Sequence, residues 1–99
     1  MQQEKINPYR DVIALPLNVF TDTRLSLRQI RILGAIYAHA DRHTGECHLR
    51  RDALAEITGY PKDRISAVTS SLVKLGWLEK TGGVGTSVPQ RYRVPSITS

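Results

Sequence analysis

Cysteine is almost absent from this sequence, and so are long apolar runs. The only cysteine is Cys47, so no disulfide bond can form within the chain. No apolar run approaches the length that spans a bilayer, and the polar residues 1–5 are unlike a signal peptide. The 99 residues contain no internal repeat and suffice for one domain with a modest core. We therefore expect a single cytoplasmic domain that does not associate with membranes.

A convincing set of metal ligands is missing as well. His39, His43 and Cys47 follow one another at intervals of four residues, and His48 comes next. His43 lies beyond the expected end of a helix, and no second cysteine completes a common structural zinc set. We expect no metal site, and Cys47 is interpreted as a small buried apolar residue.

Groups for catalysis are also lacking. A nucleophile needs a base within reach, but Ser66, Ser70 and Ser71 have no histidine nearby in the sequence. The glycine-rich residues 82–85 lack the lysine and the following helix of a phosphate-binding loop. The sequence therefore predicts that the protein is not an enzyme and needs no cofactor.

Acidic residues are outnumbered by basic ones. The net charge is +5 and the isoelectric point about 9.8. Residues 24–99 carry +6, whereas residues 1–23 carry −1. A basic small domain favours a polyanionic partner such as nucleic acid. The alternative is a solvated surface that happens to be basic.

The N-terminal residues 1–23 are expected to form an arm, ahead of a domain over residues 24–94 and a tail over residues 95–99. Within the arm, residues 11–20 are apolar but are interrupted by Pro16. This stretch fits either a short strand or an extended segment.

A first helix is predicted from Ser26, which can form a capping box with Gln29. It runs to about Ala40, with apolar residues at helical spacing. A short edge strand is expected at residues 47–49. A second helix covers residues 51–58, with Leu54 and Ile57 on its inner face.

Gly59 ends the second helix, and Pro61 suits the first turn of a third. The third helix has one inward stripe and stops at Gly76. Residues 77–81 and 90–94 are rich in strand formers, and the flexible loop between them predicts a hairpin. The inward stripe consists of Ile65, Val68, Leu72 and Leu75.

Two short helices joined by a glycine-containing turn constitute a helix-turn-helix. The segment resembles the winged-helix superfamily through Leu54-Ala55, Thr58-Gly59-Tyr60 and Leu75-Gly76-Trp77-Leu78. The resemblance implies an α+β, mostly α fold, a winged helix-turn-helix with three helices and a C-terminal β-hairpin wing. Arg50 and Pro61 stand where a capping serine or threonine is usual, which leaves the capping contacts open.

More narrowly, residues 11–94 resemble the DNA-binding domains of phage and plasmid replication initiators. The resemblance lies in Arg24-Leu25-Ser26, His39-Ala40-Asp41, Thr44-Gly45-Glu46-Cys47, Leu54-Ala55, Gly76-Trp77-Leu78, Ser87 and Tyr92. It implies sequence-specific binding of double-stranded DNA at an origin, self-association on repeated or palindromic sites, and contacts with replication machinery proteins. A winged-helix transcriptional regulator is the alternative. A winged helix used for protein binding is less favoured, because the outer face of the third helix is small and basic.

Such a domain lays its third helix in the major groove. Arg64 can pair with guanine, and Asp63 is better explained by the positive end of the helix dipole. Lys62 and Lys74 suit phosphates, whereas Ala67 can meet a thymine methyl. The residues predicted to face outward are Lys62, Asp63, Arg64, Ser66, Ala67, Ser70 and Lys74.

Two further groups of cations are predicted to contact DNA. Arg50 and Arg51 open the second helix, whose N-terminus attracts phosphate, and Arg28 near the start of the first helix is a weaker candidate. In the wing, Arg91 and Arg93 share a strand face, and Lys80 lies across the loop; these three can grip the backbone or enter the minor groove.

Overall fold

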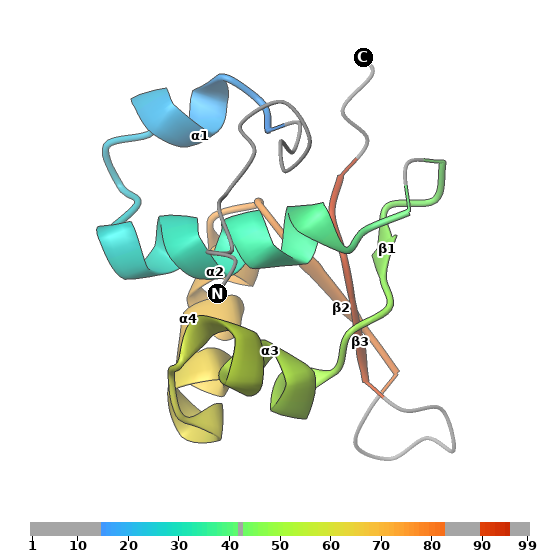
Figure 1. Ribbon diagram of the computed structural model, residues 1–99. Helices are drawn as coiled ribbons and strands as arrows, with labels where there is room; N and C mark the ends of the chain where they lie inside the picture. The colour runs from blue at the N-terminus through green and yellow to red at the C-terminus, as the bar shows by residue number, and fades with distance from the viewer. Residues whose placement is uncertain (1–14, 42, 83–89, 96–99) are drawn as a thin grey trace, which may run out of the picture.

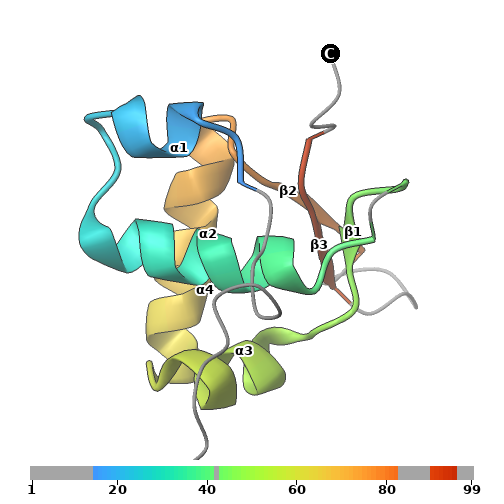
Figure 2. The ribbon, with the colours of Figure 1, turned by 45° about the horizontal axis from the view of Figure 1, so that its top comes forward.

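The computed structural model describes residues 15–41, 43–82 and 90–95. Helices α2, α3 and α4 pack against one another, and a small antiparallel sheet lies beside them (Figures 1 and 2). This arrangement confirms the mostly helical α+β fold with a C-terminal hairpin. The described elements are α1 (Asn18–Thr21), α2 (Leu27–Ala38), β1 (Glu46–Cys47), α3 (Arg51–Thr58), α4 (Lys62–Lys74), β2 (Glu79–Thr81) and β3 (Arg91–Arg93).

Helix α1 was not predicted from the sequence. Neither a strand nor an extended segment forms in the described part of residues 11–20; residues 11–14 lie outside the described range. Instead the N–H of Val19 donates to the carbonyl of Pro16 at 3.0 Å, which closes a first turn. Pro16 does not oppose this, because it supplies only its carbonyl. Val19 is fully buried, so packing against the core selects the helical turn.

The predicted capping box at the start of α2 is confirmed. The Gln29 N–H donates to Ser26 Oγ at 3.2 Å, and the Ser26 N–H donates to Gln29 Oε1 at 2.6 Å. The helix ends at Ala38, slightly before the expected Ala40. The helix ends early because Ala40 instead forms a β-bridge with Cys47.

The turn between α3 and α4 follows the prediction. Gly59 ends α3 in the left-handed region at φ 80°, where its N–H donates to Ala55 at 2.9 Å. Pro61 occupies the N-cap of α4 rather than its first turn. Both its extended backbone and the missing N–H suit that position.

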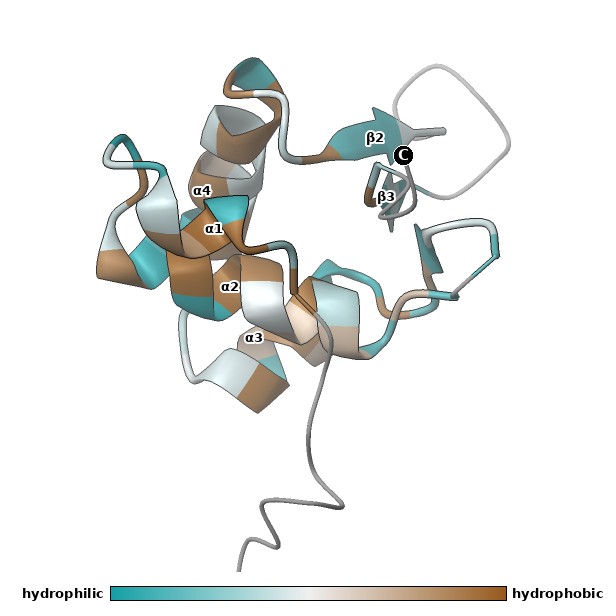
Figure 3. Cartoon of the chain, turned by 90° about the horizontal axis from the view of Figure 1, so that it is seen from above, coloured by the Kyte–Doolittle hydropathy of each residue, from teal (hydrophilic) through white to brown (hydrophobic). Residues whose placement is uncertain are grey.

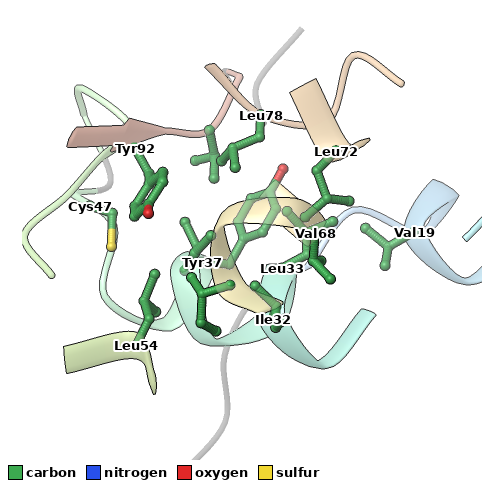
Figure 4. Close-up of a cluster of buried hydrophobic side chains, with 13 residues drawn as sticks. Val19, Ile32, Leu33, Tyr37, Cys47, Leu54, Val68, Leu72, Leu78 and Tyr92 are labelled. Carbon is green, nitrogen blue, oxygen red and sulfur yellow. The ribbon is translucent and has the colours of Figure 1, made fainter. Parts of the chain in front are cut away.

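The core joins the helices to the hairpin. Ile32, Leu33, Leu54 and Leu72 meet Leu78, Tyr92 and Val94 in one cluster, most of which Figure 4 labels. One core prediction is wrong: Ile57 is 52% exposed rather than on the inner face of α3. Leu54 alone is buried on this short helix, because α2 and α4 cover only one narrow side of it.

The three strands are shorter than predicted and lie in the order β1-β3-β2. Cys47 and Lys80 both stand opposite Tyr92, and directly opposed residues share a face. Tyr92 is buried, so this face is turned toward the helices. The short strand β1 is indeed an edge strand, but it covers Glu46–Cys47 instead of residues 47–49.

None of the described helices has both the length and the apolar character that crossing a membrane requires.

Candidate nucleic-acid interface

The outward face of α4 carries the residues that the sequence placed there. The stripe of Ile65, Val68 and Leu72 is buried together with Thr69, whose hydroxyl donates to the Ile65 carbonyl at 2.8 Å. The opposite side is therefore free of core contacts. Ser66 is half-buried, and the exposed residues are Lys62, Asp63, Arg64, Ala67, Ser70 and Lys74.

Two cations from neighbouring elements reach this helix. Arg51, the first residue of α3, donates from Nη1 to Ser66 Oγ at 2.9 Å. Lys80 in β2 donates from Nζ to Ser70 Oγ at 2.9 Å. The structure thus brings together four predicted residues from three elements. It also shows that both serine hydroxyls are already engaged by cations.

Asp63 and Lys62 at the start of α4 have local partners. Asp63 Oδ1 accepts from the Arg64 N–H at 3.0 Å, so the carboxylate lies at the positive end of the helix dipole. This agrees with the interpretation favoured from the sequence. Lys62 Nζ lies 3.4 Å from Asp52 Oδ1 on α3. Because both side chains are largely exposed, that ion pair is weak and leaves Lys62 available.

The wing cations point to two sides of the sheet. Arg91 and Arg93 flank the buried Tyr92, so they lie on the outer face, whereas Lys80 lies on the inner one. Arg93 Nε is 3.7 Å from Glu79 Oε1. In Figure 3 the strands β2 and β3 are coloured hydrophilic, in line with these charged residues. The three wing residues thus do not form one patch, and residues 83–89 of the loop lie outside the described range.

A second basic surface lies on α2. The guanidinium groups of Arg28 and Arg31 lie 5.9 and 5.6 Å from the centroid of the aromatic ring of Tyr60, a residue shortly after the end of α3. Such distances are typical of cation–π contacts. Sequence reasoning named Arg28 but missed Arg31. The signal was the three-residue spacing, which puts both arginines on one helix face.

Arg50 differs from its neighbour Arg51. It is the N-cap of α3, with extended backbone and no capping hydrogen bond from its side chain. Its side chain is exposed, and no ion pair of the described residues includes it.

The predicted absence of a metal site concerns His39, His43, Cys47 and His48. Across residues 15–41, 43–82 and 90–95, no cluster of three or more histidine, cysteine or acidic side chains is placed to hold a metal ion. Cys47 is fully buried, as interpreted from the sequence. Burial raises the pKa of its thiol, which keeps it protonated.

Comparison with known proteins gives one family. Residues 25–85, more than half of the chain, match the MarR family. The matched range includes α2, α3, α4 and β2, and therefore the whole helix-turn-helix. No curated protein and no solved structure matches the chain.

Proposed function

The chain belongs to the MarR family, and from this premise we propose that it is a transcriptional regulator that binds a specific site in double-stranded DNA. The observation that carries the proposal is the outer face of α4. That face has no core contacts and carries Arg64 and Lys74, and Arg51 and Lys80 reach it from α3 and β2. A basic helix face of this kind suits the major groove, where a helix fits between the phosphate backbones.

In this proposal some residues contact bases and others contact backbone phosphates. Arg64 pairs with a guanine through O6 and N7, and Ala67 lies against the methyl group of a thymine. Lys62 and Lys74, near the two ends of α4, contact phosphates and fix the register without reading sequence. The remaining phosphate contacts are assigned to Arg28, Arg50 and Arg51, and on the wing to Lys80, Arg91 and Arg93.

The family match favours regulation of transcription over initiation of replication. It supports the winged helix-turn-helix on which the resemblance to phage and plasmid initiators was based, but it does not support the initiator role. Origin binding and contacts with replication machinery are therefore not retained. The family is one of DNA-binding regulators, which also favours a protein without enzymatic activity.

We further propose that two copies act together on a palindromic site. Dimers of helix-turn-helix proteins place two recognition helices in successive major grooves, about 34–36 Å apart, which makes the site palindromic. The half-site spacing then reports the distance between the two α4 helices.

The test is selection of bound duplexes from a random pool at near-physiological salt, followed by sequencing. We expect one palindromic motif with half-sites about 10 base pairs apart. Arg64→Gln should lose preference at one base of each half-site. Arg24→Gln is the matched control, since it removes the same charge from the linker before α2.

Two results would contradict the proposal. No enrichment, with binding that disappears at moderate salt, would mean that the protein holds DNA only through its charge. Enrichment of direct repeats would contradict a dimeric regulator that reads a palindrome.

A further inference from the structure

Ser66 and Ser70 lie one helical turn apart on the side of α4 that faces α3 and β2. Each hydroxyl accepts a hydrogen bond of 2.9 Å from a cation: Ser66 from Arg51 Nη1 and Ser70 from Lys80 Nζ. Four residues of helix rise about 6 Å along the axis, so the serines hold the two charges at a short, fixed spacing.

Neither cation is neutralised within the described part of the chain. The ion pairs there join Arg24 to Asp22, Lys62 to Asp52 and Arg93 to Glu79, and neither Arg51 nor Lys80 takes part. Burial and, secondarily, the nearby charge of Arg51 lower the pKa of Lys80. The two cations are thus close enough to repel each other, and an anion between them would relieve that repulsion.

We propose that Ser66 and Ser70 are positioning residues that hold Arg51 and Lys80 as a clamp on one phosphate of the DNA backbone. This inference rests on the proposed DNA binding and gives an indirect role to the two serines, which were predicted from the sequence to face outward. A backbone phosphate has two free oxygens, and charge-assisted hydrogen bonds from two sides suit it. The clamp joins the helix-turn-helix to the wing, because Arg51 belongs to α3 and Lys80 to β2.

The clamp also limits which residues can read sequence. Ser66 lies on the flank of α4, and the hydroxyls of both Ser66 and Ser70 are occupied. Ala67 lies on the side away from the buried Ile65 and Leu72, because helical residues advance by about 100° each. Base contacts therefore fall to Arg64 and Ala67, as proposed above.

The first experiment counts phosphates from the salt dependence of binding to the selected duplex. The slope of log K against log salt changes by about 0.9 for each phosphate that is neutralised. If Arg51 and Lys80 share one phosphate, Arg51→Gln or Lys80→Gln alone weakens binding but leaves the slope unchanged. The double variant lowers the slope by about 0.9. A loss of about 0.9 in each single variant would overturn the clamp, because the cations would then hold separate phosphates.

The second experiment tests the serines. Ser66→Ala combined with Ser70→Ala should raise the Kd roughly three- to tenfold for all duplexes alike, as expected for the loss of two hydrogen bonds. The base preferences from the random pool should stay the same. Ser70→Thr, which keeps a hydroxyl, should bind DNA more tightly than Ser70→Ala.

Ser71→Ala is the matched control on the other flank of α4, where the hydroxyl accepts from Gln29 Nε2 at 2.9 Å. It should change neither the base preferences nor the salt slope. An altered base preference in the double serine variant would assign base reading to the serines and overturn the proposal, as would an unchanged Kd. If the unmodified protein binds no duplex, the proposed function itself fails. If it binds and only the variants depart from expectation, the clamp alone fails.

Discussion

At the scale of single residues, a few positions set the start of α2 and the turn between α3 and α4. Ser26 and Gln29 form the expected capping box, and Gly59 takes the expected left-handed conformation. The partners of Arg51 and Lys80 were not predictable, since Ser66 and Ser70 lie 15 and 10 residues away in the sequence. Contacts at such separations depend on how the elements pack, which no local rule contains.

Arg64 is the residue assigned to base reading. We expect Arg64→Ala to cost about 1–3 kcal/mol of specific binding and to relax preference at one base position, because a bidentate contact with guanine is lost. Titration of the selected duplex and of its single-base variants measures both effects. If affinity and preference both stay the same, Arg64 does not contact a base.

Gly45 is a residue whose substitution should affect folding alone. Its φ is +78°, and a Cβ there would clash with the backbone carbonyl of Val94. We expect Gly45→Ala to destabilise the protein by about 1–3 kcal/mol, through backbone strain at this junction of β1 with the C-terminal strand. Urea denaturation measures the change, and Gly34→Ala is the control, because a Cβ at Gly34 meets no atom within 4 Å. Equal effects of the two substitutions would contradict this account.

At the scale of elements, the spacing of apolar residues and the residues typical of helix and strand ends predicted α2, α3, α4 and the hairpin. The spacing of apolar residues did not predict the structure correctly where an element is short. One turn of helix in α1 has too few residues to show a period, and its conformation follows from the burial of Val19. On α3 the spacing of Leu54 and Ile57 suggested a two-residue inner face, but only Leu54 is covered by neighbouring helices.

Leu72 is one of the core residues through which α4 packs against the rest of the protein. It is fully buried, so Leu72→Ala leaves a cavity and is expected to destabilise the protein by about 2–5 kcal/mol. Val73→Ala is the control, since Val73 is the next residue and is exposed. Thermal unfolding followed by circular dichroism compares the two. An unaltered melting curve for Leu72→Ala would contradict the assignment of the core.

The wing as an element makes a separate prediction. Replacing both Arg91 and Arg93 by Gln should weaken binding to all sequences and lower the salt slope, if the outer face of β3 lies against phosphates. Binding measured between about 50 and 200 mM salt, where phosphate contacts have large effects, gives the slope. An unchanged slope would show that the outer face of β3 does not lie against phosphates.

At the scale of the whole molecule, the basic residues of the proposed interface come from several elements. Arg28 and Arg31 on α2, Arg51 on α3 and Lys80 on β2 belong to different elements, yet each lies at an exposed or half-buried position. The sequence located the basic excess in residues 24–99. The sequence could not predict which wing residues lie on which face of the sheet, because that depends on the register of β3 between its two neighbours.

The single tryptophan of the chain stands at a junction between distant segments. Its indole Nε1 donates to Asp22 Oδ2 at 2.8 Å, across 55 positions of sequence. Hydrogen bonds from Arg24 and then from Trp77 lower the pKa of that carboxylate, so it stays ionised in all but strongly acidic solution. The half-buried Trp77 is therefore a built-in fluorophore. Its emission reports, without any label, whether the segment between α1 and α2 remains attached to the end of α4.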